Sequence, residues 1–252
     1  MRQDAGTEIL AQSFGAIARD YDRFRPGPPL EAVQWLVPSG AVDVLEIGAG
    51  TGGLTRRLVE RAPHVRAVEP DARMRAVLRA RTPDAEVVAG RGEEIPAEDR
   101  SFDVVIGASS WHWVDEELAL PEVARVLRPR GTFSLLWSGA DRSVDWMRSL
   151  WSGGRETGAE EARRRERHAV NLGVGSPFHE PERRVFRWTR RMTEDELVGM
   201  AGTYSAVITM GAAERQEYLD SVRRVLASHE APNDNGSIEV PMRCLCWRTT
   251  LR

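Results

Sequence analysis

The chain has 252 residues, of which 41% are apolar, which is enough for one α/β domain with a buried core and a modest insertion. The formal net charge of −3 and the pI near 6.0 give no reason to expect nucleic acid or an anionic membrane surface as a partner. All 35 basic residues are arginine, so P-loop, Schiff-base and lysine-dependent dehydrogenase chemistries are excluded.

Targeting and metal-binding signals are missing from the sequence. Residues 1–15 do not resemble a signal peptide, and no apolar run approaches the ~18 residues of a membrane span. Cys244 and Cys246 lie on one face of an expected strand, which suits core residues better than a disulfide or a zinc site. We expect a soluble, cytoplasmic monomer or homodimer without a metal.

In chain order, a helical leader comes first. It contains a helix at residues 8–23 and a short helix that ends near Trp35. Short apolar runs then alternate with amphipathic stretches, a pattern typical of βα units on a parallel sheet. The expected strands are 42–47, 65–69, 86–89, 103–108 and 132–137. The expected helices are 51–61, 71–81 and 116–127, and residues 128–131 break the chain before the fifth strand.

The second half of the chain is less regular. It holds a charged run at 155–168, a strand at 183–190, a helix capped by Thr193 with Glu196 three residues on, and a helix at 212–229. Residues 236–250 form a closing strand. We therefore divide the chain into a leader (1–40), a core (41–141), a lid insertion (142–235) and a last strand (236–252).

The most informative segment is a glycine-rich turn after the first strand. Gly48, Gly50, Gly52 and Gly53 allow a tight turn and a close approach of a ligand to the backbone. The same glycines also fit the dinucleotide pattern GxGxxG. The turn by itself therefore leaves a nicotinamide enzyme and a methyltransferase open.

Two carboxylates flank this turn. Glu46 stands two residues before the first glycine, where it suits the ammonium group of S-adenosylmethionine and would repel a pyrophosphate. Glu69 ends the second strand and is placed to accept hydrogen bonds from both ribose hydroxyls, in either class of ligand. Glu46 thus favours S-adenosylmethionine over a dinucleotide. The alternative is that the Glu46 carboxylate only interacts with the positive end of a helix dipole.

Five segments in order resemble the class I methyltransferases of the ubiquinone/menaquinone-biosynthesis and trans-aconitate methyltransferase type. They are residues 45–52, 68–74, 90–96, 101–105 and 123–131. The resemblance covers about residues 20–137 and implies an α/β, Rossmann-like, doubly wound seven-stranded sheet. This sheet would be mostly parallel, with an antiparallel last strand, and would carry an α-rich lid.

The resemblance also implies a set of residues around the methyl donor. The methionyl part would lie against Glu46 and the loop from Gly48 to Gly52, and the ribose would lie against Glu69. Pro70 and Met74 would cover one face of the adenine. Gly92 and Glu93 would lie at the edge of the adenine ring. In full, the implied donor-binding residues are Glu46, Gly48, Ala49, Gly50, Gly52, Glu69, Pro70, Met74, Gly92, Glu93, Ala108, Tyr21 and Arg25. Tyr21 would cover the sulfonium and Arg25 would pair with the donor carboxylate, unless Arg25 is simply solvated.

One residue departs from the family pattern. The family often has Asp where this chain has Arg91, and a guanidinium cannot accept a hydrogen bond from the adenine amino group. Glu93 or a backbone carbonyl would have to substitute, or the adenine end would be held more weakly.

The segment after the fourth strand faces the acceptor in the related enzymes. There His112 is a candidate general base, and the alternative is that it only shapes the pocket together with Trp113. The expected substrate-facing residues are Trp111, Trp113 and Tyr204. His168, His179 and the basic run 163–167 are expected on the surface.

The sequence thus predicts an S-adenosylmethionine-dependent methyltransferase of small-molecule or secondary metabolism, which methylates an O, N or C atom of a small, partly apolar molecule. The lid and leader would choose this acceptor. A nicotinamide oxidoreductase is the weaker alternative. A methyltransferase-like protein that catalyses another reaction, such as a cyclisation, or that only binds S-adenosylmethionine also stays open.

Overall fold

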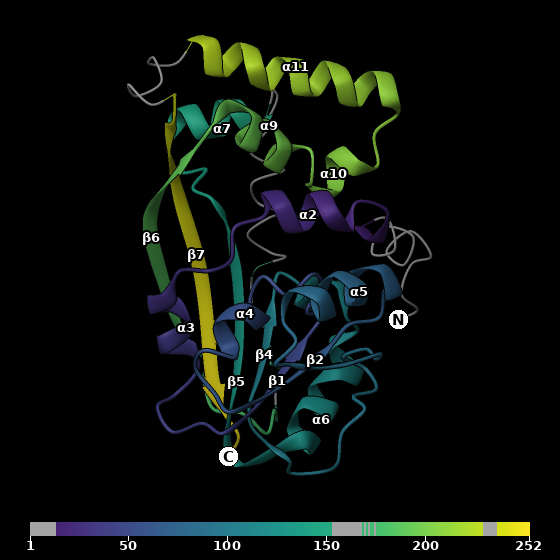
Figure 1. The fold of residues 1–252 in the computed structure, drawn as a ribbon. Coiled ribbons are helices and arrows are strands. Elements are labelled where there is room, and N and C mark those ends of the chain that lie inside the picture. Colours follow the sequence, from purple (N-terminus) through teal and green to yellow (C-terminus); the bar gives the residue numbers. More distant parts are fainter. Residues whose placement is uncertain (1–13, 153–167, 169, 171, 174, 229–235) are drawn as a thin grey trace.

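The computed structural model describes residues 14–152, 168, 170, 172–173, 175–228 and 236–252. Its centre is a seven-stranded sheet with the order β3-β2-β1-β4-β5-β7-β6 (Figure 1). The strands are β1 Asp43–Ile47, β2 His64–Val68, β3 Glu86–Val88, β4 Phe102–Ala108, β5 Leu127–Ala140, β6 Glu182–Met192 and β7 Ile238–Thr250.

The pairing of these strands confirms the expected sheet. The five strands from β3 to β5 are parallel to their neighbours. The last strand of the chain, β7, lies antiparallel to both β5 and β6. The sheet is therefore mostly parallel with one antiparallel strand, as the sequence predicts.

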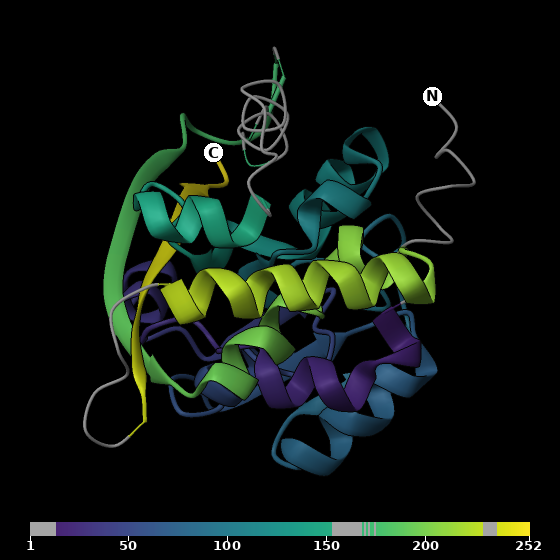
Figure 2. The ribbon, with the colours of Figure 1, turned by 90° about the horizontal axis from the view of Figure 1, so that it is seen from above.

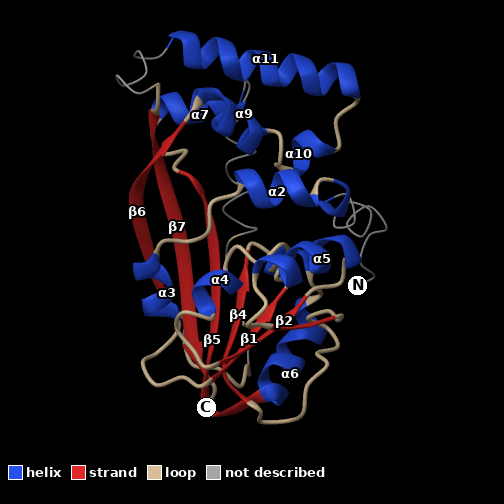
Figure 3. Ribbon diagram, in the orientation of Figure 1, coloured by secondary structure: helices blue, strands red, loops and turns tan. Residues whose placement is uncertain are grey.

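Helices cover both faces of the sheet and gather above its carboxyl-terminal edge (Figures 1 and 3). The described helices are α2 Ala18–Phe24, α3 Leu30–Leu36, α4 Thr55–Leu58, α5 Ala72–Arg81, the 3-10 helix η1 Trp111–Trp113, α6 Glu116–Val126, α7 Asp145–Ser152, α9 Glu194–Ala201, α10 Ser205–Ile208 and α11 Ala212–Ser228. The predicted capping box of α9 is present, since Thr193 and Glu196 cap each other's backbone amides.

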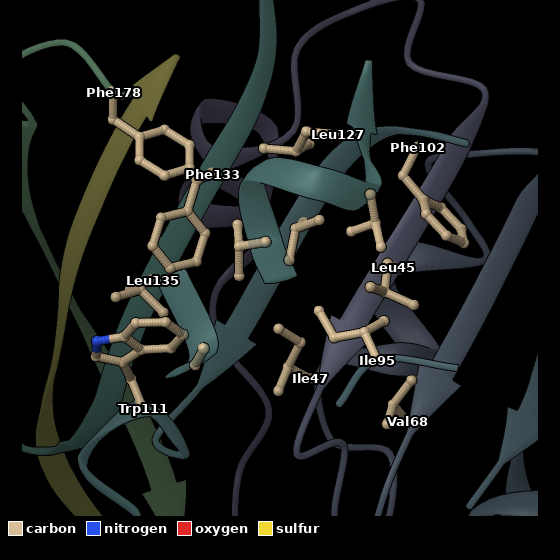
Figure 4. Close-up of a cluster of buried hydrophobic side chains, with 14 of the residues drawn as sticks. Leu45, Ile47, Val68, Ile95, Phe102, Trp111, Leu127, Phe133, Leu135 and Phe178 are labelled. Atoms are coloured by element: carbon tan, nitrogen blue, oxygen red, sulfur yellow. The ribbon is translucent and has the colours of Figure 1, made fainter. Parts of the chain in front are cut away.

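Alternate residues of the central strands point to opposite faces of the sheet and pack into two separate hydrophobic cores. On one face, Leu45 and Ile47 of β1 pack with Val123 of α6, as Figure 4 shows for the strand residues. On the other face, Val44 packs with α3, α4 and the thiols of β7. Cys244 and Cys246 are both buried and free, which confirms that they are core residues.

Two expected elements differ from the structure. The helix expected at 51–61 is regular only over Thr55–Leu58, because Gly52 adopts a φ of +88° and delays the first helical turn. Residues 128–131 do not break the chain before the fifth strand. They form a bulge within β5, where Arg130 has a φ of +64° and Arg128 bonds Asp103 at 2.7 Å.

The leader helix also has different bounds. Of the helix expected at 8–23, residues 14–16 are helical, Ile17 forms a turn and α2 follows at Ala18–Phe24, whereas residues 1–13 lie outside the described part of the chain. Most of the charged run 155–168 lies outside it too.

The helices above the sheet enclose a core of their own. Residues of α7, α9 and α11 pack against the carboxyl end of β6 and the amino end of β7. Phe24 of α2 packs against the same cluster. An added Cβ at Gly199 of α9 would lie 2.6 Å from the Phe24 ring, so the glycine permits this close contact between leader and lid. Seen from above, α11 lies across the molecule, with α7 on one side of it and α2 on the other (Figure 2).

We predict that the parallel core is sensitive to truncation of a single strand residue. Leu45 is fully buried, so Leu45→Ala should lower the free energy of unfolding by about 2–5 kcal/mol. Leu118 is 57% exposed, and the matched change Leu118→Ala should stay within about 0.5 kcal/mol of the parent. Urea unfolding of the three proteins measures both values, and equal losses would contradict this assignment of the core.

Candidate functional site

A cavity of about 440 Å³ lies at the carboxyl ends of β1, β2 and β4. This is the point where the strand order reverses, and open α/β sheets bind their ligands there. The lining residues are Phe14, Tyr21, Ile47, Gly48, Gly50, Glu69, Pro70, Asp71, Ala72, Arg73, Met74, Arg91, Gly92, Glu93, Ala108, Ser109, Ser110, Trp113 and Val114. The volume is within the range of small-molecule and cofactor sites.

The turn after β1 forms one wall of the cavity. Gly48 has a φ of +65°, and a Cβ added to it would lie 2.5 Å from the Cβ of Ser110. Ser110 holds this approach through its hydroxyl, which donates to the carbonyl of Ile47 at 2.8 Å. A side chain at position 48 is thus excluded by both backbone conformation and space.

Glu69 connects two loops at the cavity wall. Its Oε2 accepts the Gly50 N–H and its Oε1 accepts the Asp71 N–H, each at 2.9 Å. Burial raises the pKa of Glu69, and the two backbone hydrogen bonds oppose this shift. Each carboxylate oxygen has a second lone pair, so the group can still accept hydrogen bonds from a ligand.

The far end of the cavity is built around the start of α5. Asp71 caps this helix by accepting the amide N–H groups of Arg73 and Met74. Burial of Asp71 favours its neutral form, but the bonds from Arg73 and the two amides outweigh it and lower the pKa. Arg91 and Glu93 line the same end, and Oε1 of Glu93 accepts the Asp115 N–H at 2.9 Å.

Glu46 lies behind the glycine turn and is not among the lining residues. It is 1% exposed, and its Oε2 accepts the hydroxyl proton of Thr55 at 2.6 Å. Burial raises the pKa of Glu46 to about 8, and the nearby charge of Glu69 adds to this shift while the Thr55 hydrogen bond opposes it. The sheet therefore holds an acid next to the cavity that can change charge near neutral pH.

Aromatic side chains form the side of the cavity that faces the lid. Phe14 lies edge-on to both Tyr21 and Trp113, with ring centroids 5.7 Å and 6.0 Å apart. Trp113 in turn lies 4.7 Å from the His112 ring. Phe14 has no counterpart in the sequence motifs, so sequence reasoning did not identify it.

Trp111 lies elsewhere. It is 3% exposed and packs on Phe133 in the core, with ring centroids 4.9 Å apart (Figure 4). Trp111 and Trp113 differ in position because both belong to the 3-10 helix η1, in which nearby side chains point in different directions. The structure thus directs Trp113 into the cavity and Trp111 away from it.

Arg25 and Tyr204 meet in the lid rather than at the cavity wall. The Arg25 guanidinium lies 3.8 Å above the Tyr204 ring and donates to the hydroxyl and carbonyl oxygens of Thr203. Burial alone would raise the pKa of Tyr204, but the positive charges of Arg25 and Arg142 outweigh this effect and lower it.

Ten predicted residues line the cavity: Tyr21, Gly48, Gly50, Glu69, Pro70, Met74, Gly92, Glu93, Ala108 and Trp113. Seven do not: Arg25, Glu46, Ala49, Gly52, Trp111, His112 and Tyr204. Phe14, Arg73, Ser110 and Val114 also line it but were not predicted. Ser110 could have been found from its place directly after β4, at the same edge as the glycine turn.

The two isolated histidines behave differently from each other. His179 is exposed, as the sequence predicts. His168 is only partly exposed, because its ring stacks on Trp137 with centroids 5.1 Å apart. Within the described part of the chain, no three His, Cys, Asp or Glu side chains gather as a metal site, and no helix is long and apolar enough to cross a membrane.

The raised pKa of Glu46 makes stability depend on pH. The folded protein keeps a proton that the unfolded chain releases above the ordinary value of 4.5, so stability should fall as pH rises from 4.5 to about 8. Glu46→Gln cannot ionise and should flatten this part of the curve. Urea unfolding of the ligand-free protein across this range tests the effect, with Glu117→Gln, an exposed site, as control. Parallel curves for the parent and Glu46→Gln would contradict it.

Comparison with known proteins agrees with this geometry. Residues 45–135 match a family described as a methyltransferase domain. An uncharacterised methyltransferase of Mycobacterium tuberculosis is 41% identical over 242 residues, which cover 96% of this chain and 97% of the relative.

Solved structures share the fold. One assigned to a type II methyltransferase from Anaeromyxobacter dehalogenans has a TM-score of 0.65 and 24% identity, and covers 91% of this chain and 98% of its own. A phosphoethanolamine N-methyltransferase of Haemonchus contortus, solved with phosphomonomethylethanolamine and S-adenosylhomocysteine, has a TM-score of 0.53 and 14% identity, covering 94% of this chain and 57% of its own. The chain belongs to the class I, S-adenosylmethionine-dependent methyltransferases.

Proposed function

We propose that this methyltransferase transfers its methyl group to a small, partly apolar molecule held between the strand ends and the lid. The observation that carries the proposal is the aromatic wall of the donor cavity, where Phe14, Tyr21 and Trp113 meet. This wall leads from the glycine turn toward the helices of the lid. Such an apolar surface suits a small organic acceptor better than a charged polymer.

The residues present fit the methyl donor. The glycine turn leaves room for the methionyl part, and Glu69 offers free lone pairs to the ribose hydroxyls. Pro70 and Met74 provide an apolar surface for one face of the adenine, and Glu93 lies at the same end of the cavity. The buried carboxyl of Glu46 lies behind the glycine turn, and above its raised pKa of about 8 the ionised form would attract the donor ammonium.

S-adenosylmethionine supplies a methyl group that is already activated by its positive sulfur. The protein then has to orient the acceptor in line with the carbon–sulfur bond and to exclude water. Tyr21 and Trp113 can do both, because aromatic faces attract a cation and repel solvent. The His112 ring lies 4.7 Å from that of Trp113, and we place His112 on the acceptor side.

The lid and leader are the natural place for acceptor choice. The strand ends of β1, β2 and β4 already face the donor cavity, so the remaining walls must come from α2 and the segment 142–235. Tyr204 belongs to this part of the protein, beneath Arg25, and we assign it to the acceptor side. Arg25 is held by Thr203 in the same place, which favours a role toward the acceptor over one toward the donor.

We predict that Glu69 contributes to donor binding through its hydrogen bonds. Glu69→Gln should weaken S-adenosylhomocysteine binding by about 1.5–3 kcal/mol, the scale for hydrogen bonds to a charged group. Calorimetry measures this change, and Glu86→Gln, at an exposed site on β3, serves as a matched control. Unchanged affinity in Glu69→Gln, with the fold intact, would refute the role.

A lid exchange tests where the acceptor is chosen. Replacing residues 142–235 by the matching segment of the Mycobacterium tuberculosis relative should leave S-adenosylhomocysteine affinity within about twofold and change the set of molecules that are methylated. A compound screen with methyl-labelled donor gives the readout, and formation of S-adenosylhomocysteine in equal amount confirms transfer. If the chimera and the parent methylate the same molecules while the relative does not, the core selects the acceptor.

A further inference from the structure

The leader touches the donor-binding loops at two glycines. Gly15 lies just before α2, and a Cβ added to it would collide with the carboxylate of Asp71, which caps α5. Gly27 lies shortly after α2, and its added Cβ would lie 2.7 Å from the carbonyl oxygen of Gly53 in the glycine turn. A side chain at either glycine would therefore force the leader or these loops to shift.

The same leader supplies part of the cavity wall. Phe14 and Tyr21 line the cavity, where the Phe14 ring also meets Trp113. The helix α2 itself has only seven residues and no side-chain cap at its amino end. So short a helix is not stable alone in water, and its position depends on contacts with the rest of the protein. The contacts that hold α2 therefore decide whether the two aromatic rings stay at the cavity.

Asp22, next to Tyr21 in α2, provides such a contact. Its side chain is only 5% exposed and bridges two helices of the core. Oδ1 accepts from Arg56 of α4 at 3.0 Å, and Oδ2 accepts from Arg81 of α5 at 2.8 Å. The Arg56 guanidinium also donates to the carbonyl of Thr51, at 3.1 Å, in the turn before α4. One buried carboxylate thus ties the leader, through charge-assisted bonds, to the helices that follow the two donor-binding loops.

We propose that Asp22 is a positioning residue for the methyl donor, which holds the leader over the occupied cavity and slows release of the donor and of its product. With Asp22 bonded to α4 and α5, Phe14 and Tyr21 stay at the cavity wall, and a bound ligand leaves faster when α2 moves away. The proposal concerns the donor side and does not depend on which acceptor is methylated. The alternative is that these ion pairs only stabilise the fold, so that their loss lowers stability without a specific effect on release.

Release of S-adenosylhomocysteine measures this role without an acceptor. Asp22→Asn removes the negative charge, so the off-rate of tritium-labelled S-adenosylhomocysteine, chased with excess unlabelled ligand, should rise at least about tenfold. The on-rate should stay within about threefold, because the loops that bind the ligand are unchanged. Asp20→Asn, at an exposed site of the same helix, is the matched control and should leave both rates unchanged. An unchanged off-rate in folded Asp22→Asn, or a loss of affinity that comes from the on-rate alone, would overturn the proposal.

A second variant keeps the test decisive if Asp22→Asn does not fold. Arg81→Gln removes one of the two ion pairs at a side chain that is 62% exposed, and it should raise the off-rate at least about threefold. The double variant Asp22→Asn/Arg81→Gln should release the ligand at the rate of Asp22→Asn alone, because both changes break the same bond. An unchanged off-rate in Arg81→Gln, or effects that multiply in the double variant, would count against the proposal.

A core variant separates ligand release from general stability. Val126→Ala truncates a fully buried residue of α6 that does not line the cavity, and it should lower the urea midpoint to a degree similar to Asp22→Asn. Its off-rate for S-adenosylhomocysteine should nevertheless stay within about twofold of the parent. If Val126→Ala speeds release as much as Asp22→Asn does for the same loss of stability, the ion pairs of Asp22 only stabilise the fold and the proposal fails.

Discussion

The donor site depends on the buried carboxylate of Glu69. This single side chain accepts N–H groups from the loop after β1 and from the loop after β2, and so holds two neighbouring strand ends in a fixed relation. Such charge-assisted bonds are stronger than bonds between neutral groups, especially away from water. Glu69 thus ties the glycine turn to the loop that leads into α5.

A second carboxyl, that of Glu46, lies behind the same turn. Burial and the charge of Glu69 both favour its protonated form, and Thr55 supplies its hydrogen bond. In its ionised form Glu46 would attract the ammonium group of S-adenosylmethionine and would disfavour the phosphates of a dinucleotide, which is consistent with the methyltransferase family of the chain.

The long strands β5, β6 and β7 extend from the sheet to the helices above it. β5 carries the core residues Phe133 and Trp137, and the indole N–H of Trp137 also contacts His112. The outer strand β6 is an exposed edge, and it is rich in arginine: Arg183, Arg184, Arg187, Arg190 and Arg191. Charged edge strands resist pairing with other chains, which gives part of the arginine content a structural reason.

The sequence by itself determined the sheet, the glycine turn, Glu69 and most of the donor cavity. These features rest on local signals: apolar periodicity sets strands and helices, and carboxyl ends of parallel strands must meet at one edge. Only the tertiary structure decided which neighbouring side chains face the cavity. It placed Trp111 in the core and Trp113 in the cavity, a choice made by the path of η1. It also brought Trp137 to His112 and Arg25 to Thr203, across 25 and 178 positions of the chain, because such contacts depend on how β5 and the lid pack in space.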